Sequence, residues 1–137
     1  MDDYGDGLAT GDLDGPEQVA VLVRRFYAAV DKDDLLGPMF NEVAQVDWPE
    51  HLVKLTAFWS RALFGIPGYH GNPFRAHLLV HSRRPFTPAH FERWLELFRQ
   101  TLDRGWQGPK ADQASELARK VAGVHSHQLV DKEVSST

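Results

Sequence analysis

The sequence predicts an all-α fold, because its apolar residues recur at steps of three and four along four separate stretches. Segments rich in glycine and proline separate these stretches, and none shows the every-second-residue alternation of a strand. At 137 residues, the chain is long enough to bury one hydrophobic core. We therefore expect a single helical domain over residues 15–130, a mobile acidic tail at 1–14 and a frayed tail at 131–137.

Composition excludes several classes of function. The chain has no cysteine, which rules out disulfides, thiolate catalysis and covalent haem attachment. Its net charge is −4, but residues 1–14 hold five aspartates and no base, leaving 14 acidic against 15 basic residues elsewhere. That balance argues against nucleic acid as a partner. With no signal-peptide pattern and no membrane-spanning apolar run, we expect a cytoplasmic protein that does not bind a membrane.

The first helix is predicted to begin at Pro16, because proline is favoured in the first turn and follows an acidic entry. Its inward face places Tyr27, and so a hydroxyl group, in an otherwise apolar interior. Gly37 and Pro38 then interrupt the helical pattern, and we expect a compact corner with Phe40 buried. The predicted apolar face consists of Val19, Leu22, Val23, Phe26, Tyr27 and Val30.

The second helix is predicted to start at Asp47, whose carboxylate can cap it, with Glu50 three residues later completing a capping box. It should end in the glycine- and proline-rich stretch 65–68. Its inward face is predicted to hold aromatic, aliphatic and imidazole side chains: Trp48, His51, Leu52, Leu55, Phe58, Trp59 and Leu63.

The second half of the chain holds a short segment and two further helices. The short segment carries His77 and His81 one helical turn apart, and Thr87-Pro88 begins a strongly amphipathic helix. The buried stripe of that helix should contain Phe91, Trp94, Leu95, Phe98 and Leu102. The stripe of the last helix should contain Ala114, Leu117, Ala118, Val121, Val124 and Leu129. The histidines expected at the surface are His70, His90, His125 and His127.

Four polar side chains fall on inward faces or in the short segment: Tyr27, His51, His77 and Trp94. Taken singly, each is more simply a core or surface residue. Taken together, they suit haem, which needs an imidazole on one face of its iron. On the other face, donors must point at the partial negative charge of a diatomic ligand, as tyrosine, tryptophan and histidine can.

An ordered series of motifs spans roughly residues 16–129, and the series resembles the truncated haemoglobins, specifically their group III branch. Each motif alone is weakly specific, but their order and spacing together are strongly so. The motifs are Phe26-Tyr27, residues 36–41 (LGPMFN), residues 48–51 (WPEH), Phe58-Trp59, residues 71–77 (GNPFRAH) and residues 91–98 (FERWLELF).

The resemblance implies a two-over-two helical sandwich around a b-type haem. Carried over by position, His77 matches the proximal iron ligand, while Tyr27, Trp94 and His51 match distal residues that stabilise the ligand. In addition, Leu55 matches an apolar residue over the ligand site, Phe40 an aromatic that packs on the porphyrin, and Trp59 an aromatic deeper in the same helix.

The histidine that holds the iron depends on the direction of counting. Counting forward from residues 71–73 selects His77, whereas counting back from Trp94 selects His81. We take His77, because relatives with a longer loop keep the first histidine and vary the second, and we keep His81 as the alternative.

The resemblance further implies binding of O₂, CO or NO. A polar distal pocket slows O₂ release, which suits NO or peroxide detoxification with a reductase as partner better than bulk O₂ transport. The corresponding activities would be those of an NO dioxygenase or a peroxidase. Two alternatives are a haem-based sensor and an all-α interaction module that binds no haem.

Overall fold

The structure, a computed structural model, describes residues 11–131, and every regular element in that range is helical. The predicted all-α fold is confirmed. No helix of the described part is long and apolar enough to cross a membrane. The elements are α1 (Pro16–Lys32), η1 (Met39–Val43), α2 (Trp48–Phe64), α3 (Pro73–Arg83), α4 (Pro88–Gly105), α5 (Pro109–Ser126) and η2 (His127–Asp131), where η denotes a π-helical turn.

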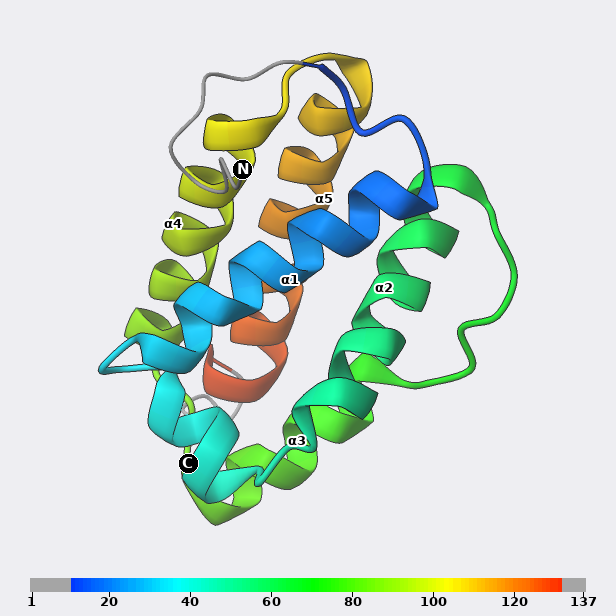
Figure 1. The fold of residues 1–137 in the computed structure, drawn as a ribbon. Coiled ribbons are helices and arrows are strands. Elements are labelled where there is room, and N and C mark those ends of the chain that lie inside the picture. The colour runs from blue at the N-terminus through cyan, green and yellow to red at the C-terminus, as the bar shows by residue number, and fades with distance from the viewer. Residues whose placement is uncertain (1–10, 132–137) are drawn as a thin grey trace.

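The long helices form two packed pairs. Helix α1 packs against α2, α4 packs against α5, and α1 also crosses α4 and joins the two pairs. Figure 1 shows this two-over-two arrangement, with the shorter α3 at the lower end of the view. At the centre, Phe26 of α1 meets Phe98 of α4 edge to face at 5.1 Å between ring centroids. Trp59 of α2 stacks on the same Phe98 at 5.0 Å.

Helix α1 buries the face that its sequence predicted. Pro16 stands at the start of the helix, and all six predicted residues are at most 4% exposed. Burial of each such side chain contributes about 1.5–3 kcal/mol, so this face is a major source of stability. It also fixes Tyr27 in the interior, where its hydroxyl must find polar partners.

The corner after α1 differs from the prediction in one respect. Gly37 passes close to the α1 backbone, and the chain then enters the π-helical turn η1. Met39, not Phe40, is the buried side chain of this turn, at 2% exposed. Phe40 is only half-buried, so the expectation of a fully buried Phe40 was wrong. A π-helical turn spreads its side chains more widely than an α-helix, which leaves Phe40 at the edge of the core.

The ends of α2 and α4 follow the predicted signals. The Asp47 carboxylate accepts a hydrogen bond from the Glu50 backbone N–H at 3.3 Å, and Gly65 ends α2 with φ of 70°. At the start of α4, His90 takes the part of the glutamate in a capping box, because its Nδ1 accepts from the Thr87 N–H at 2.9 Å.

The last predicted helix buries Ala114, Ala118 and Leu129 as expected, but it differs from the prediction at Val124 and His125. Val124 was placed in the buried stripe, but it is 54% exposed. His125 was placed at the surface, but it is only 8% exposed. The buried residues follow steps of three and four from the helix start, and that spacing brings position 125 inward. They are Ala111, Ala114, Ala118, Ala122 and His125.

The folded part begins earlier than predicted. Residues 1–10 of the expected tail lie outside the described residues, as do residues 132–137 at the other end. Residues 11–14, however, pack on the domain. Leu13 is completely buried, and the Asp12 carboxylate accepts hydrogen bonds from the Lys110 and Ala111 N–H groups at 2.9 and 2.7 Å. The prediction of a mobile tail was therefore wrong for this stretch.

Candidate functional site

The hydroxyl of Tyr27 is the polar centre of the first of two clusters. Tyr27 lies on α1 and is 4% exposed, and Trp94 of α4 donates its indole Nε1–H to the Tyr27 oxygen at 3.3 Å. Because an indole N–H can only donate, Tyr27 must be the acceptor. Among the side chains that the structure describes, those of residues 11–72 and 77–129, none accepts the hydroxyl hydrogen of Tyr27 itself. That hydrogen is therefore available to a further acceptor.

Three aromatic rings surround His51 of α2. Its ring centroid lies 6.1 Å from that of Tyr27, 5.9 Å from Phe40 and 5.7 Å from Trp48, each contact being edge to face. Phe40 and Trp48 in turn stack on each other at 5.6 Å. The imidazole is thus held in place by ring packing, next to the Tyr27–Trp94 pair.

Trp48 belongs to this cluster, although the sequence did not select it as a site residue. Trp48 opens α2 directly after the Asp47 cap, so it was assigned only to the inward face of that helix. Its indole N–H donates to Asn41 Oδ1 at 2.8 Å, and Asn41 donates to Asp31 Oδ1 at 2.8 Å. The spacing could have indicated this contact, because Trp48 lies three residues before His51 and therefore one helical turn away on the same face.

Both titratable groups of this cluster are neutral at neutral pH. Burial raises the pKa of the Tyr27 hydroxyl above its usual range, and the hydrogen bond from Trp94 offsets this only in part. Burial lowers the pKa of His51 below its ordinary value, and the charge of Lys54 lowers it further. The cluster therefore offers a neutral O–H donor beside a neutral imidazole, which can both donate and accept a hydrogen bond.

The second cluster surrounds His77 on α3. Its half-buried ring lies 4.7 Å from that of His125 and 5.9 Å from that of Phe86. His125 Nδ1 lies 2.9 Å from the Val121 carbonyl oxygen, so this nitrogen donates and fixes the ring on α5. A buried side chain of the last helix thus packs on the histidine that the sequence selected.

The alternative histidine, His81, has its δ nitrogen engaged. It is 6% exposed, its Nδ1 accepts from the Phe86 backbone N–H at 2.9 Å, and its ring stacks on the Phe86 ring at 5.9 Å. A neutral imidazole that accepts at Nδ1 carries its hydrogen on Nε2. In this tautomer, Nε2 has no lone pair to give to a metal.

Helix α4 connects the two clusters. Phe91 near its start packs on Phe86 at 5.4 Å, and Trp94 follows one turn later. Leu55 is half-buried on α2, one turn after His51, and Trp59 is 2% exposed in the core below it. The predicted residues Tyr27, His51, Trp94 and Phe40 thus meet in the first cluster, whereas His77 and His81 lie in the second. Trp59 instead packs on Phe98 in the core.

The grouping of side chains bears on the kind of metal that the site could hold. Among the described residues, no three histidine, aspartate or glutamate side chains are grouped as they would be for a bare metal ion. A single imidazole suits a metal that a macrocycle already holds.

An open groove of about 570 Å³ lies beside α2 and shares no lining residue with either cluster. It is lined by Phe58, Arg61, Ala62, Tyr69, His70 and Gly71.

Comparisons with known proteins agree with the observed fold. A family model described as bacterial-like globin matches residues 11–126. The group 3 truncated hemoglobin ctb of Campylobacter jejuni is 39% identical over 90 residues, which span 64% of this chain and 68% of that protein. The crystal structure of a group III truncated hemoglobin from Campylobacter jejuni matches with a TM-score of 0.74 at 33% identity. That match covers 84% of this chain and 91% of the other. The chain therefore belongs to the bacterial-like globin family, and within it to the group III truncated haemoglobins.

Proposed function

We propose that the chain binds haem b through His77 and holds a diatomic ligand under Tyr27, Trp94 and His51. Membership of the globin family implies a haem protein that binds diatomic ligands. Haem b needs no covalent link to the protein, and the sequence has no cysteine that could form the links of a c-type haem. Held by His77, haem would supply an iron that can bind O₂, CO or NO.

The observation that carries this proposal is the half-satisfied hydroxyl of Tyr27. A buried donor without an acceptor costs about 1–3 kcal/mol and is rare in a native interior. The indole of Trp94 occupies one side of the oxygen, so the hydroxyl hydrogen must point elsewhere. A ligand atom with partial negative charge would satisfy that hydrogen, and burial keeps the hydroxyl protonated for the purpose.

The choice of His77 as the axial ligand rests on the tautomers in the second cluster. His81 is committed at Nδ1 to the Phe86 N–H, and in the resulting tautomer its Nε2 carries the hydrogen. His77 lies one turn earlier on α3, half-buried against His125 and Phe86. His81 then serves to close the turn after α3, and His77 is the better candidate for the iron.

We propose further that the site favours ligand chemistry over O₂ transport. Each hydrogen bond to a charged ligand atom is worth roughly 1.5–3 kcal/mol, so a ligand held by Tyr27 leaves slowly. Slow release suits detoxification of NO or peroxide, with a reductase returning the iron to its reduced state. The neutral imidazole of His51 can accept and return a proton at its ring nitrogen, as general acid–base chemistry on peroxide requires.

Visible spectra of the haem-reconstituted protein test the proposal. We expect a sharp Soret band that is lost or shifted in His77→Gly and restored by free imidazole, which can fill the space of the removed side chain. The matched control is His81→Gly, which should keep the parent spectrum. A Soret band lost or shifted in His81→Gly and unchanged in His77→Gly would identify His81 as the iron ligand. If the parent protein took up no haem specifically, the haem proposal would be wrong and the chain would be an all-α interaction module.

Measuring catalytic turnover of NO or peroxide distinguishes an enzyme from a protein that only binds the ligand. Consumption of NO by the O₂-loaded protein, or of peroxide with an added electron donor, should be catalytic and should depend on Tyr27 or His51. Stoichiometric consumption that stops after one equivalent would leave a ligand-binding or sensing function.

A further inference from the structure

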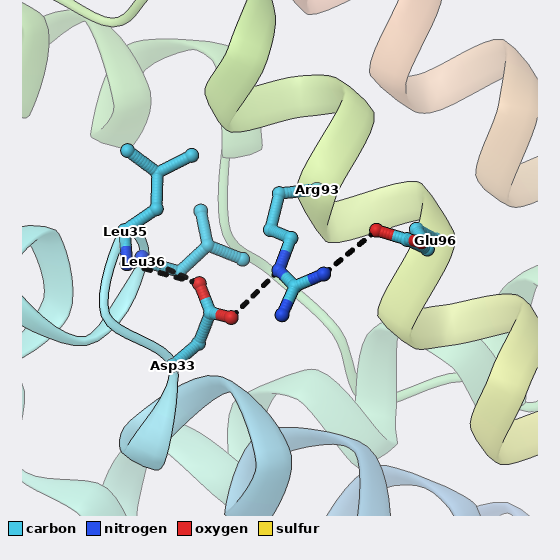
Figure 2. A network of polar contacts seen from close by, with 5 residues as sticks. All are labelled: Asp33, Leu35, Leu36, Arg93 and Glu96. Carbon is cyan, nitrogen blue, oxygen red and sulfur yellow. Dashed lines mark hydrogen bonds and ion pairs between the residues drawn. The ribbon is translucent and has the colours of Figure 1, made fainter.

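A buried carboxylate connects the end of α1 to the first half of α4. Asp33 follows the last residue of α1, and its side chain is 5% exposed. One carboxylate oxygen accepts from the Leu35 and Leu36 N–H groups at 3.1 and 3.0 Å, and the other accepts from Arg93 Nε at 2.7 Å. Figure 2 shows these bonds, together with the contact between Arg93 and Glu96 at 2.8 Å.

The charge of Asp33 is maintained by these bonds. Burial alone would raise the pKa of Asp33, but the hydrogen bonds from Leu36, Arg93 and Leu35 outweigh it and hold the pKa below its usual range. Asp33 is thus ionised at neutral pH. It links two helices through Arg93, whose own side chain is 41% exposed.

The same two helices carry the Tyr27–Trp94 pair. Tyr27 lies on α1, six residues before Asp33, and Trp94 directly follows Arg93 on α4. The Trp94–Tyr27 hydrogen bond is 3.3 Å long, at the weak end of the range for an N–H···O contact. A shift of a few tenths of an ångström between α1 and α4 would therefore break it, whereas it would leave most of the packing intact.

We infer that Asp33 is a positioning residue whose bond to Arg93 sets the distance between α1 and α4 at which Trp94 reaches Tyr27. The inference rests on the proposed function only for its effect on ligand binding. The effect on the Trp94–Tyr27 bond itself belongs to the protein without haem. Glu96 contacts the far end of Arg93 from the same helix, and its side chain is 53% exposed.

The test uses the full chain, with Arg93→Gln and Asp33→Asn as the disrupting variants and Glu96→Gln as the matched control. Arg93→Gln leaves the hydrogen bonds from the Leu35 and Leu36 N–H groups to Asp33 in place. It removes the link between the helices together with the Arg93–Glu96 contact, and Glu96→Gln removes that contact alone. Far-UV circular dichroism establishes that each variant is folded, and Arg93→Gln keeps the inference testable if Asp33→Asn unfolds.

The first readout needs no haem. The indole Nε1–H resonance of Trp94, assigned by its absence in Trp94→Phe, reports on the hydrogen bond to Tyr27. We expect it to move toward the position of a free indole in Arg93→Gln and in Asp33→Asn, and to stay in place in Glu96→Gln. An unmoved resonance in folded Arg93→Gln would overturn the inference, whatever the protein binds.

The second readout is O₂ dissociation from the haem-loaded protein. We expect Arg93→Gln to speed release about three- to tenfold, a part of the effect of losing the Tyr27 bond. In a Tyr27→Phe background the same substitution should have no further effect, because it acts through that hydroxyl. Equal effects in both backgrounds would contradict the inference, whereas absence of haem binding would contradict only the proposed function.

Discussion

The indole of Trp94 donates to the hydroxyl oxygen of Tyr27 across 3.3 Å. This bond joins α4 to α1 in a part of the interior where Tyr27 is 4% exposed. It also orients Tyr27, because the side of the oxygen that accepts from the indole cannot hold the hydroxyl hydrogen. The pair thus presents one O–H donor in a defined direction.

Replacing Tyr27 by Phe should speed O₂ dissociation from the haem-loaded protein roughly ten- to hundredfold, because it removes a hydrogen bond worth about 1.5–3 kcal/mol. Stopped-flow displacement of O₂ by CO measures the rate. The control is Tyr69→Phe, which removes the same hydroxyl group from a half-buried tyrosine that lines the groove beside α2. A rate unchanged in Tyr27→Phe would remove this hydroxyl from the ligand site.

The lowered pKa of His51 predicts a loss of stability in mild acid. A histidine that binds protons less readily when folded contributes stability that is fully present above its ordinary pKa of about 6.5 and is lost as the pH falls through the lower folded value. Urea unfolding at pH 7.5 and pH 5 should therefore show a smaller decrease for His51→Leu than for the parent. His90, whose pKa is also lowered, is present in both proteins and cancels. Equal decreases would indicate that His51 does not titrate as described.

The bond from the Phe86 N–H to His81 predicts a structural effect on stability. His81→Ala should lower the free energy of unfolding by roughly 1–3 kcal/mol, because it leaves a part-buried N–H without its acceptor. The exposed His70→Ala is the control and should change it by less than about 0.5 kcal/mol. Denaturant titration measures both. If His81→Ala left the free energy of unfolding unchanged, the Phe86 N–H would not depend on the imidazole. His81 would then become the candidate for binding the iron.

The helices could be predicted from the sequence because each encodes its buried face locally. On α1, the three- and four-residue steps correctly predicted every buried side chain. On α5 the prediction failed at Val124 and His125, because residue type was given more weight than helical phase. Positions 111, 114, 118 and 122 are all alanines, and their spacing alone would have placed residue 125 inside.

The candidate site could be predicted only where its members had a distinctive chemistry. Tyr27, His51 and Trp94 were selected as polar groups on apolar faces, and the structure brings them together. Trp48 and His125 were missed, because neither a tryptophan at a helix start nor a histidine near a helix end is unusual. The Asp33–Arg93 bond spans 60 residues, and no local pattern encodes such a pair.

The long-range cap formed by Asp12 predicts a stability effect from a residue that looked like part of a tail. Its carboxylate accepts from two N–H groups at the start of α5. Asp12→Ala should lower the free energy of unfolding by about 0.5–2 kcal/mol, as loss of a helix cap does, and exposed Asp14→Ala should not. Urea unfolding of the full chain measures the difference.

The pH dependence of that difference gives a second check. Burial would raise the pKa of Asp12, but the hydrogen bonds from Lys110, Ala111 and Leu13 outweigh it, and the pKa is lowered. The contribution of Asp12 is therefore present above its ordinary value of 3.8 and disappears as the pH falls through the lower folded value. The parent and Asp12→Ala should converge in acid, and a constant difference would contradict the cap.

Two glycines should respond oppositely to alanine because of what lies beside them. A Cβ added at Gly37 would lie 2.8 Å from the Asp31 carbonyl oxygen, so the backbone must move, at a cost of about 1–3 kcal/mol. Nothing lies within 4 Å of a Cβ added at Gly123 in α5, so Gly123→Ala should stabilise by roughly 0.5–1 kcal/mol. Thermal unfolding of both variants tests this pair.

Gly37→Ala should also affect the proposed ligand site, because the displaced chain leads directly into η1 and Phe40. Phe40 contacts the rings of Tyr27 and His51 at 5.9 Å, so a shift of the corner changes how the imidazole is held. CO rebinding to haem-loaded Gly37→Ala should therefore differ from the parent, while Gly123→Ala should match it. If Gly37→Ala were as stable as the parent and rebound CO at the same rate, the close approach of Gly37 to α1 could not be what sets the position of Phe40.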